Sequence, residues 1–141
     1  MKCSIELRVG GSVGPLRVEL GSIDRECHGA EDVGLRLEEA KRLLERLQEE
    51  LVRRQIAEFL ERRHRCARCR MLYRTRGHHA VRLRSAFGDL TLQSPRWRAC
   101  PCRHAGSPAS FSPLAELLPG RTTPELEHLL ARWSAYGAFE A

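Results

Sequence analysis

Two closely spaced cysteine pairs constrain this chain more than any other feature of its sequence. Two residues separate Cys66 from Cys69, one separates Cys100 from Cys102, and thirty residues lie between the pairs. Four thiolates can close a tetrahedral zinc site, and a site in which the protein supplies all four ligands is structural rather than catalytic. We therefore predict a structural zinc ion bound by these four cysteines.

Histidines close to the cysteines leave the ligand set open. His64 precedes the first pair by two residues and His104 follows the second pair by two, so either could replace one cysteine. Free thiols or a disulfide are the alternative. We expect no secretory leader and no membrane-spanning segment, hence a cytoplasmic protein, and paired cysteines in a reducing compartment more often bind metal. Cys3 and Cys27 have no partner at ligand spacing and are expected to be ordinary core or loop residues.

The segment from Arg62 to Arg103 is strongly basic, with twelve arginines and one acid, Asp89. The formal net charge of the whole chain is +6, and all of its 24 basic residues except Lys2 and Lys41 are arginine. The planar guanidinium suits bidentate contacts to phosphate and guanine. A GC-rich genome also raises arginine content, but it does not explain the clustering.

Arginines recur at every second position along three expected strands of this segment. Side chains two residues apart project from the same face of a strand, so we predict one sheet face with an arginine array that binds DNA phosphates. The predicted DNA contacts are Arg74, Arg76, Arg82, Arg84, Arg96 and Arg98. A solvated face is the alternative, although such faces usually mix charges. Trp97 and Tyr73 are expected either to stack on a base or to lie in the core.

The hydrophobic pattern predicts an α+β fold. Period-two alternation over residues 2–9 and 16–20 predicts an N-terminal β-hairpin, and apolar residues at helical spacing from Leu37 to Arg62 predict one long amphipathic helix. Alternation around a turn at 87–89 predicts a small zinc-ribbon-like antiparallel sheet, with a strand break at Ser94–Pro95. A helical turn over 114–118 and a helix over 125–135 form a short helical tail.

These elements divide the chain into three expected parts. Residues 1–64 hold the hairpin and long helix, residues 65–105 form a basic, zinc-ribbon-like module, and residues 106–141 form a Pro-rich linker and C-terminal helix. A strict heptad seam covers only the first half of the long helix, so we expect it to pack on the chain's own core. A homodimer through the helix 37–60 is the alternative. No acidic triad, Gly-rich phosphate loop or metalloprotease motif is visible, and we expect no membrane or small-molecule partner.

Several motifs occur in the same order as in a known protein family. They include FGDLTLQSPR at 87–96, the second cysteine pair, and FSPLAELLP at 111–119. The first cysteine pair, the stretch RGHH at 76–79, the helix end IAEFL at 56–60 and the opening hairpin match in order as well. In these features the chain resembles the N-terminal region of insertion-sequence transposases of the ISKra type, up to about residues 136–137.

The resemblance implies a zinc-binding, DNA-recognising N-terminal part followed by an RNase H-like catalytic domain with an acidic triad and a divalent metal. Nothing that matches the catalytic domain follows Gly137. We therefore expect a transposase fragment that recognises transposon DNA without catalysing strand transfer. The alternatives are an interaction module that forms mixed dimers with a full-length transposase through the helix 37–60, and a decayed remnant without function.

Overall fold

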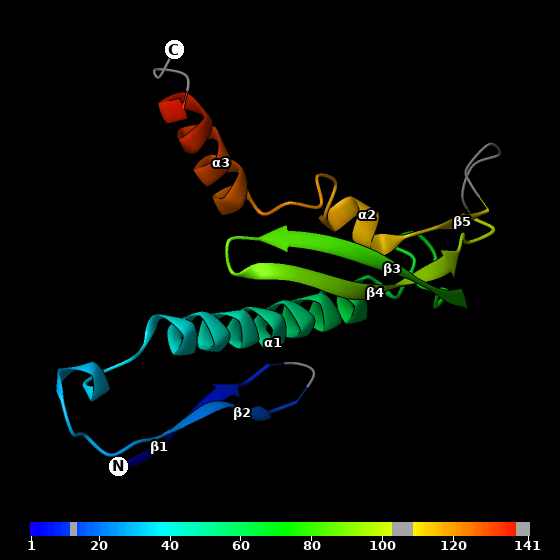
Figure 1. Cartoon of the computed structure of the whole chain (residues 1–141). Helices are drawn as coiled ribbons and strands as arrows, with labels where there is room; N and C mark the ends of the chain where they lie inside the picture. The colour runs from blue at the N-terminus through cyan, green and yellow to red at the C-terminus, as the bar shows by residue number, and fades with distance from the viewer. Residues whose placement is uncertain (12–13, 103–108, 138–141) are drawn as a thin grey trace. The chain divides into compact units, whose positions relative to one another are not determined.

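The computed structural model describes residues 1–11, 14–102 and 109–137. It confirms the predicted α+β class: a two-stranded hairpin, a long helix, a three-stranded antiparallel sheet and two shorter helices follow one another along the chain (Figure 1). The chain separates into two compact units, Met1–Phe59 (unit 1) and Leu60–Ala141 (unit 2). No helix within the described ranges combines the length and apolarity needed to cross a membrane.

The hairpin of unit 1 consists of β1 (Lys2–Val9) and β2 (Leu16–Asp24), which pair in antiparallel register. Exposed and less exposed residues alternate along β2 and along β1 from Ser4 onward, as the period-two pattern predicts. Ile5 lies opposite Gly21 and Glu6 lies opposite Glu19, so Leu20 is an extra residue of β2, and it is buried. The hairpin therefore has one apolar face.

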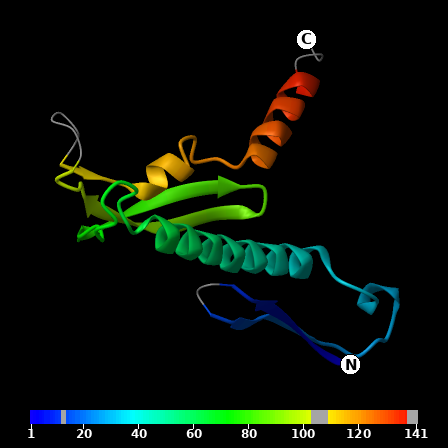
Figure 2. The ribbon, with the colours of Figure 1, turned by 180° about the vertical axis from the view of Figure 1, so that it is seen from behind.

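The long helix α1 (Leu37–Arg63) runs alongside this hairpin (Figure 2). A Cβ atom on Gly21 would lie 2.9 Å from Cδ2 of Leu43, so β2 approaches α1 closely at a residue without a side chain. Val52 and Ile56 are the buried residues of α1. Acidic residues in its first turn and basic residues in its last turn complement the helix dipole.

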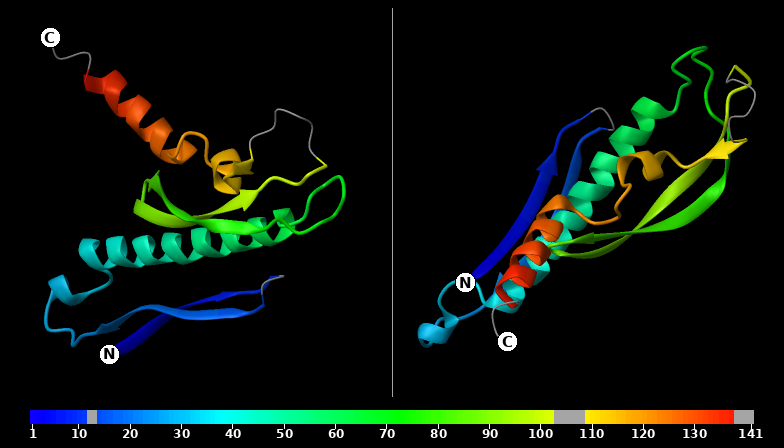
Figure 3. Two further views of the ribbon diagram at one scale, coloured as in Figure 1. Left: turned by 90° about the vertical axis from the view of Figure 1, so that its right-hand side faces the viewer. Right: turned by 90° about the horizontal axis from the view of Figure 1, so that it is seen from above.

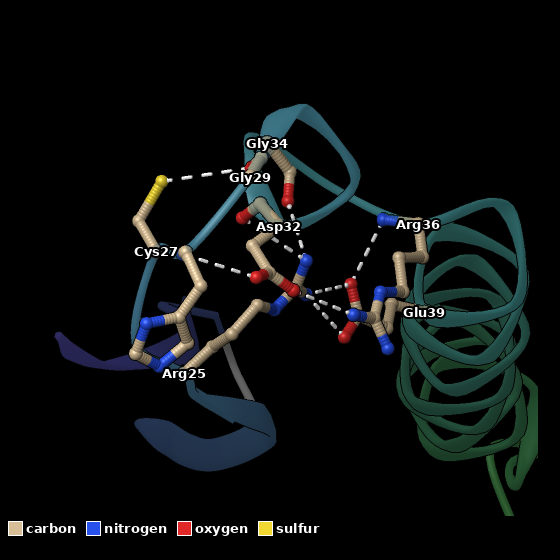
Figure 4. A network of polar contacts seen from close by, with 8 residues as sticks. Arg25, Cys27, Gly29, Asp32, Gly34, Arg36 and Glu39 are labelled. Carbon is tan, nitrogen blue, oxygen red and sulfur yellow. Dashed lines mark hydrogen bonds and ion pairs between the residues drawn. The ribbon is translucent and has the colours of Figure 1, made fainter.

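A polar network around Arg25 joins the end of β2 to the start of α1 (Figure 4). The Arg25 guanidinium donates to both carboxylate oxygens of Glu39, at 2.5 and 2.6 Å, and to the carbonyl oxygens of Asp32 and Gly34. Glu39 also accepts a hydrogen bond from the backbone N–H of Arg36, at 2.8 Å, just before the first helical residue. A glutamate three positions into a helix commonly satisfies this N-terminal donor.

Unit 2 is built on a sheet with the strand order β3-β4-β5. β3 (Thr75–Ser85) and β4 (Gly88–Arg98) form an antiparallel hairpin, and β5 (Ser110–Phe111) pairs with the end of β4. The turn is Ala86–Phe87, because Gly88 is already paired with Ser85. Both strands are longer than expected, and β5 comes from a segment that the sequence pattern indicates as linker.

The predicted strand break at Ser94–Pro95 is wrong, because both residues lie inside β4. The backbone N–H and carbonyl of Arg84 point away from β4 and bond to Arg121 and Thr123. Its partner in the register, Asp89, therefore occupies a position whose backbone groups do not bond to β3. Alternate β4 residues from Asp89 to Pro95 share that orientation. Pro95 also lies beyond the two residues that β5 pairs with, so its missing N–H removes no ladder bond.

The core of unit 2 lies between the sheet and the C-terminal segment. Val81, Leu83, Leu90 and Leu92 are buried on one sheet face. The short helix α2 (Pro113–Leu117) lies over the sheet (Figure 3), and Leu114 is fully buried there. The Ser94 hydroxyl, also fully buried, lies 2.8 Å from the Ser112 hydroxyl.

The C-terminal helix α3 (Pro124–Gly137) begins next to this sheet and is mostly exposed. Its start is fixed by the backbone bonds of Arg121 and Thr123 to Arg84. Proline occupies the first position of both α2 and α3, where a missing N–H costs nothing. Both helices confirm the predicted helical tail.

Candidate metal centre and basic face

The four paired cysteines come together at one end of the β3–β4 hairpin, which we call the cysteine end. The sulfur atoms of Cys66, Cys69, Cys100 and Cys102 all lie within 4.8 Å of one another. Cys66 Sγ is 3.5 Å from Cys102 Sγ, and Cys69 Sγ is 3.1 Å from Cys100 Sγ. Cys66 and Cys100 are buried, whereas Cys69 is exposed. Residues from before β3 and after β4 thus form one thiol cluster that could hold a metal ion.

The first pair lies in a tight turn over residues 66–71, the knuckle. The Arg70 N–H donates to the Cys66 carbonyl and the Cys66 N–H donates to the Met71 carbonyl, both at 2.9 Å. Arg70 takes a left-handed conformation, with φ of 62°, that closes the turn. The Arg68 guanidinium donates to the Cys102 carbonyl at 3.0 Å. The knuckle is therefore tied to the second cysteine pair by a side chain as well as by sulfur proximity.

The pKa values of Cys66, Cys69 and Cys102 are shifted in different directions. Backbone N–H groups of Cys69 and Arg68 donate to the sulfur of Cys66 and lower its pKa to about 6. Hydrogen bonds that the protonated Cys102 thiol donates to the neighbouring sulfurs, Cys100 first, raise its pKa to about 12, and a bond to the Cys100 sulfur likewise raises the pKa of Cys69. Several thiolates at this spacing would repel one another, so some of the four sulfurs keep their protons.

Histidine substitution finds no support in the described residues. His64 is half-buried, its Nε2 lies 3.0 Å from the Tyr73 carbonyl oxygen, and its ring stacks on Trp97 at 5.4 Å between centroids. It does not belong to the thiol cluster. His104 lies outside the described residues. Cys3 and Cys27 are both exposed and lie outside the cluster, so neither is a core residue.

A cluster of aromatic rings packs next to the cysteine end. Trp97 is buried, which settles it as a core residue, and it stacks on Tyr73 at 5.5 Å between ring centroids. Phe111 of β5 meets both rings edge-on, at 5.1 Å from Tyr73 and 5.9 Å from Trp97. No alternation in the sequence predicts β5, and the aromatic residue Phe111 after a serine-rich stretch is its one local signal.

The pairing register divides the six predicted arginines between the two faces of the sheet. Arg82 lies opposite Thr91 and Arg84 opposite Asp89, and directly paired residues share a face. Alternation along β4 then puts Arg96 and Arg98 on the other face. A bulge in β3 leaves Arg76 and Gly77 together opposite Arg96, and the bond from the Arg98 N–H to the Arg74 carbonyl puts Arg74 opposite Arg98. The expected single array of six is wrong in this respect.

Four arginines therefore form one group, which we call the basic face: Arg74, Arg76, Arg96 and Arg98. All four are exposed, and none forms an ion pair with a residue that the structure describes. Arg82, on the opposite face, is bound to Asp89 at 2.6 Å. The basic face thus has uncompensated charge, and Arg82 does not.

The buried side of β4 changes where the basic face begins. Leu90, Leu92 and Ser94 are buried on one face, whereas Pro95 and Trp97 are buried on the other, against the aromatic rings. Arg96 and Arg98 consequently project from the face on which Leu90 and Leu92 are buried in the first half of β4. A single sequence pattern cannot show this change, because each half of the strand alternates normally.

The acidic residues form no catalytic cluster in the described part of the chain. The cysteine cluster is the sole grouping of three or more metal-ligating side chains found there. Asp32 accepts hydrogen bonds from Arg36 and from the His28 N–H, so it belongs to the network at the start of α1. Comparison with known proteins found no matching family model, no similar curated protein and no similar solved structure.

Proposed function

We propose that this chain is a DNA-binding module in which a structural zinc ion, held by Cys66, Cys69, Cys100 and Cys102, fixes the basic face. The proposal rests on four exposed arginines that form no ion pair within the described residues and that lie on the chain segments next to the four converging sulfurs. The role of the metal is to hold the knuckle and the end of β4 together. The arginines would bind phosphate.

The distances between the sulfurs support zinc as the metal. Tetrahedral zinc with Zn–S bonds of about 2.3 Å separates its ligand sulfurs by about 3.8 Å. The sulfur pairs at 3.1 and 3.5 Å, with all four atoms within 4.8 Å, bracket that value. A cluster of four thiolates offers soft ligands and leaves no position for water, which favours a structural role.

The charge of the basic face supports DNA as the partner. A folded protein usually intersperses both signs of charge on its surface, and an exposed cluster of one sign raises the local concentration of a polyanion. Each phosphate neutralised by an arginine adds about 0.9 to the slope of log affinity against log salt for duplex DNA. Four arginines would therefore account for a slope of roughly 3 to 4.

We further propose that the module belongs to the N-terminal region of an ISKra-type transposase and has no catalytic activity of its own. The support is the order of the motifs at 56–60, 66–69, 76–79, 87–96, 100–102 and 111–119. The transposon end would be its DNA target, and strand transfer would be the task of the catalytic domain that the family has. A cytoplasmic location fits this role.

A gel-shift titration at several salt concentrations tests the DNA proposal. We expect the Arg→Gln substitution of Arg74, Arg76, Arg96 and Arg98 to weaken duplex binding at least tenfold and to lower the salt slope by about 3. The control is the same change at four exposed arginines of unit 1, namely Arg8, Arg42, Arg46 and Arg53. Equal effects of the two sets would show that net charge, and not the basic face, is responsible.

A dimerisation module is the second candidate function. Leu37 and Leu44, which are seven residues apart on α1, are both exposed, with 70% and 42% of their surface accessible. A heptad spacing of exposed leucines favours pairing with another copy or with a longer transposase chain. Sedimentation of the full chain discriminates: a tight dimer that ignores DNA supports this candidate, and a monomer that binds DNA supports the first.

A further inference from the structure

A pocket of about 260 Å³ opens where the knuckle meets the end of β4. Met71, Leu72, Tyr73 and Arg74 line it on the knuckle side, and Arg98 and Pro101 line it on the side of the second cysteine pair. Two residues of the basic face, Arg74 and Arg98, are therefore also pocket residues. The pocket belongs to the part of unit 2 that the metal centre would hold rigid.

The two arginines give the pocket an anion-binding rim. Arg74 and Arg98 lie directly opposite each other, joined by the backbone bond of 2.8 Å between the Arg98 N–H and the Arg74 carbonyl. Like charges directly opposite one another across two strands destabilise the pairing. Neither has an acidic partner among the residues described, so an anion between the two guanidinium groups would relieve their repulsion.

The end of the knuckle and the residues after it give the same pocket an apolar wall. Met71 and Leu72 are large apolar residues, yet 61% and 53% of their surface is exposed. Next to them, the Tyr73 ring is fixed by stacking on Trp97 and by the edge contact with Phe111. Exposed apolar residues rimmed by polar ones often mark a ligand groove. The pocket therefore suits a ligand with one flat apolar part and one anionic part.

We propose that this pocket binds a single unstacked nucleotide of DNA. The base would lie against Met71, Leu72 and Tyr73, and an adjoining phosphate would lie between Arg74 and Arg98. The volume is slightly below the roughly 300 Å³ at which pockets for drug-sized ligands begin, so one nucleotide suits it and a stacked base pair does not. The inference rests on the proposed DNA binding and deepens it, because it predicts a preference for single-stranded or locally unpaired DNA.

Fluorescence anisotropy with the full zinc-loaded chain tests this inference. Three labelled DNAs of one length are compared: a single strand, the duplex of the same sequence, and a single strand in which every base is replaced by an abasic site. The test variant is Leu72→Gln, with Met71→Ser as a second variant in case the first disturbs the knuckle. Leu130→Gln, at an exposed leucine of α3, is the matched control. Retained burial of Trp97, read from its emission, verifies the fold of each variant.

We expect Leu72→Gln to weaken binding of the normal single strand about tenfold, which is the typical contribution of one base contact, and to change duplex and abasic binding less than twofold. The Leu130→Gln control should change none of the three. Equal weakening for all three DNAs, or no weakening at all in both wall variants, would overturn the pocket while leaving duplex binding by the basic face intact. Failure of the unsubstituted chain to bind any of the three DNAs would overturn both proposals.

Discussion

The arginines of unit 1 and those of the basic face in unit 2 differ in their partners. In unit 1, most arginines form ion pairs with acids, such as Arg17 with Glu6 at 2.8 Å and Arg25 with Glu39 at 2.5 Å. In unit 2, the four arginines of the basic face have no acidic partner in the described ranges. Arginine content alone therefore says little about binding. What distinguishes the basic face is that none of its arginines forms an ion pair within the described residues.

The difference follows from what holds each unit together. Unit 1 has few buried apolar residues, namely Leu20, Val52 and Ile56, so ion pairs and hydrogen bonds at its edges contribute to its structure. Unit 2 has an apolar core closed by Leu114 and, in our proposal, a metal centre at its other end. The four arginines of the basic face form no ion pair in the described ranges, and in our proposal they bind a ligand.

Removal of the metal should produce the largest difference between the two units. Structural zinc in small domains has apparent binding free energies of roughly 10–16 kcal/mol, so we expect chelation or Cys66→Ser to unfold unit 2 and leave the hairpin and α1 formed. Tryptophan emission reports this, because Trp97 is 3% exposed and Trp133 is 76% exposed. Cys27→Ser is the control. A Trp97 environment unchanged by chelation would contradict a metal-dependent unit 2.

Loss of core packing in unit 2 should have the next largest effect. Leu114 is fully buried between α2 and the sheet, so Leu114→Ala should lower the free energy of unfolding by about 2–5 kcal/mol. Leu130→Ala, at a residue 47% exposed on α3, should change it by less than about 0.5 kcal/mol. Denaturant titration of the metal-loaded chain measures both. Similar losses for the two variants would mean that α2 is no more tightly packed than α3.

The knuckle offers a smaller and more local test. Arg70 has φ of 62°, a conformation that costs a β-branched residue more than an unbranched one and costs glycine nothing. Arg70→Val should therefore destabilise unit 2 by about 1–2 kcal/mol, and Arg70→Gly should be neutral or stabilising by up to about 1 kcal/mol. Thermal melts of the metal-loaded variants give the ranking. Glycine that destabilises as much as valine would rule out strain at this turn.

The smallest predicted effect concerns acid sensitivity of unit 1. The Arg36 N–H and the Arg25 guanidinium hold the pKa of Glu39 below its ordinary value. The ionised carboxylate therefore contributes stability that is complete above the pKa of the unfolded chain and disappears as the pH falls through the lower, folded pKa. Glu39→Gln should flatten this part of the stability profile, measured by amide exchange of β2 between about pH 5 and pH 2. Identical stability profiles for Glu39→Gln and the unsubstituted chain would show that Glu39 does not contribute to the acid sensitivity of unit 1.

Much of the fold could be predicted because its signals are local. The hairpin, the long helix and the two C-terminal helices follow from alternation, helical spacing and proline at helix starts. The continuation of β4 through Pro95 depends on which way each backbone N–H points, and β5 depends on pairing with Trp97. Both are set by tertiary partners that a local pattern does not contain.

The sequence predicts which four cysteines cluster, but it does not predict how the arginines are arranged on the surface. Cysteine spacing was enough to select the four residues whose sulfurs converge. The arginine array failed as a single surface because the bulge opposite Arg96 and the change of buried side at Ser94–Pro95 alter which face each residue occupies. The pocket was missed because Met71 and Leu72 look like ordinary apolar residues until their exposure is known.

X-ray absorption at the zinc edge, with metal content measured on the same sample, tests whether the four cysteines bind zinc. For the full chain purified without added metal, we predict about one zinc ion per chain with four sulfur ligands at about 2.3 Å. Cys66→Ser should lose the metal, and His64→Gln should retain it with an unchanged spectrum. Less than about half an equivalent of zinc, or a nitrogen ligand that disappears in His64→Gln, would contradict a centre made of these four thiolates.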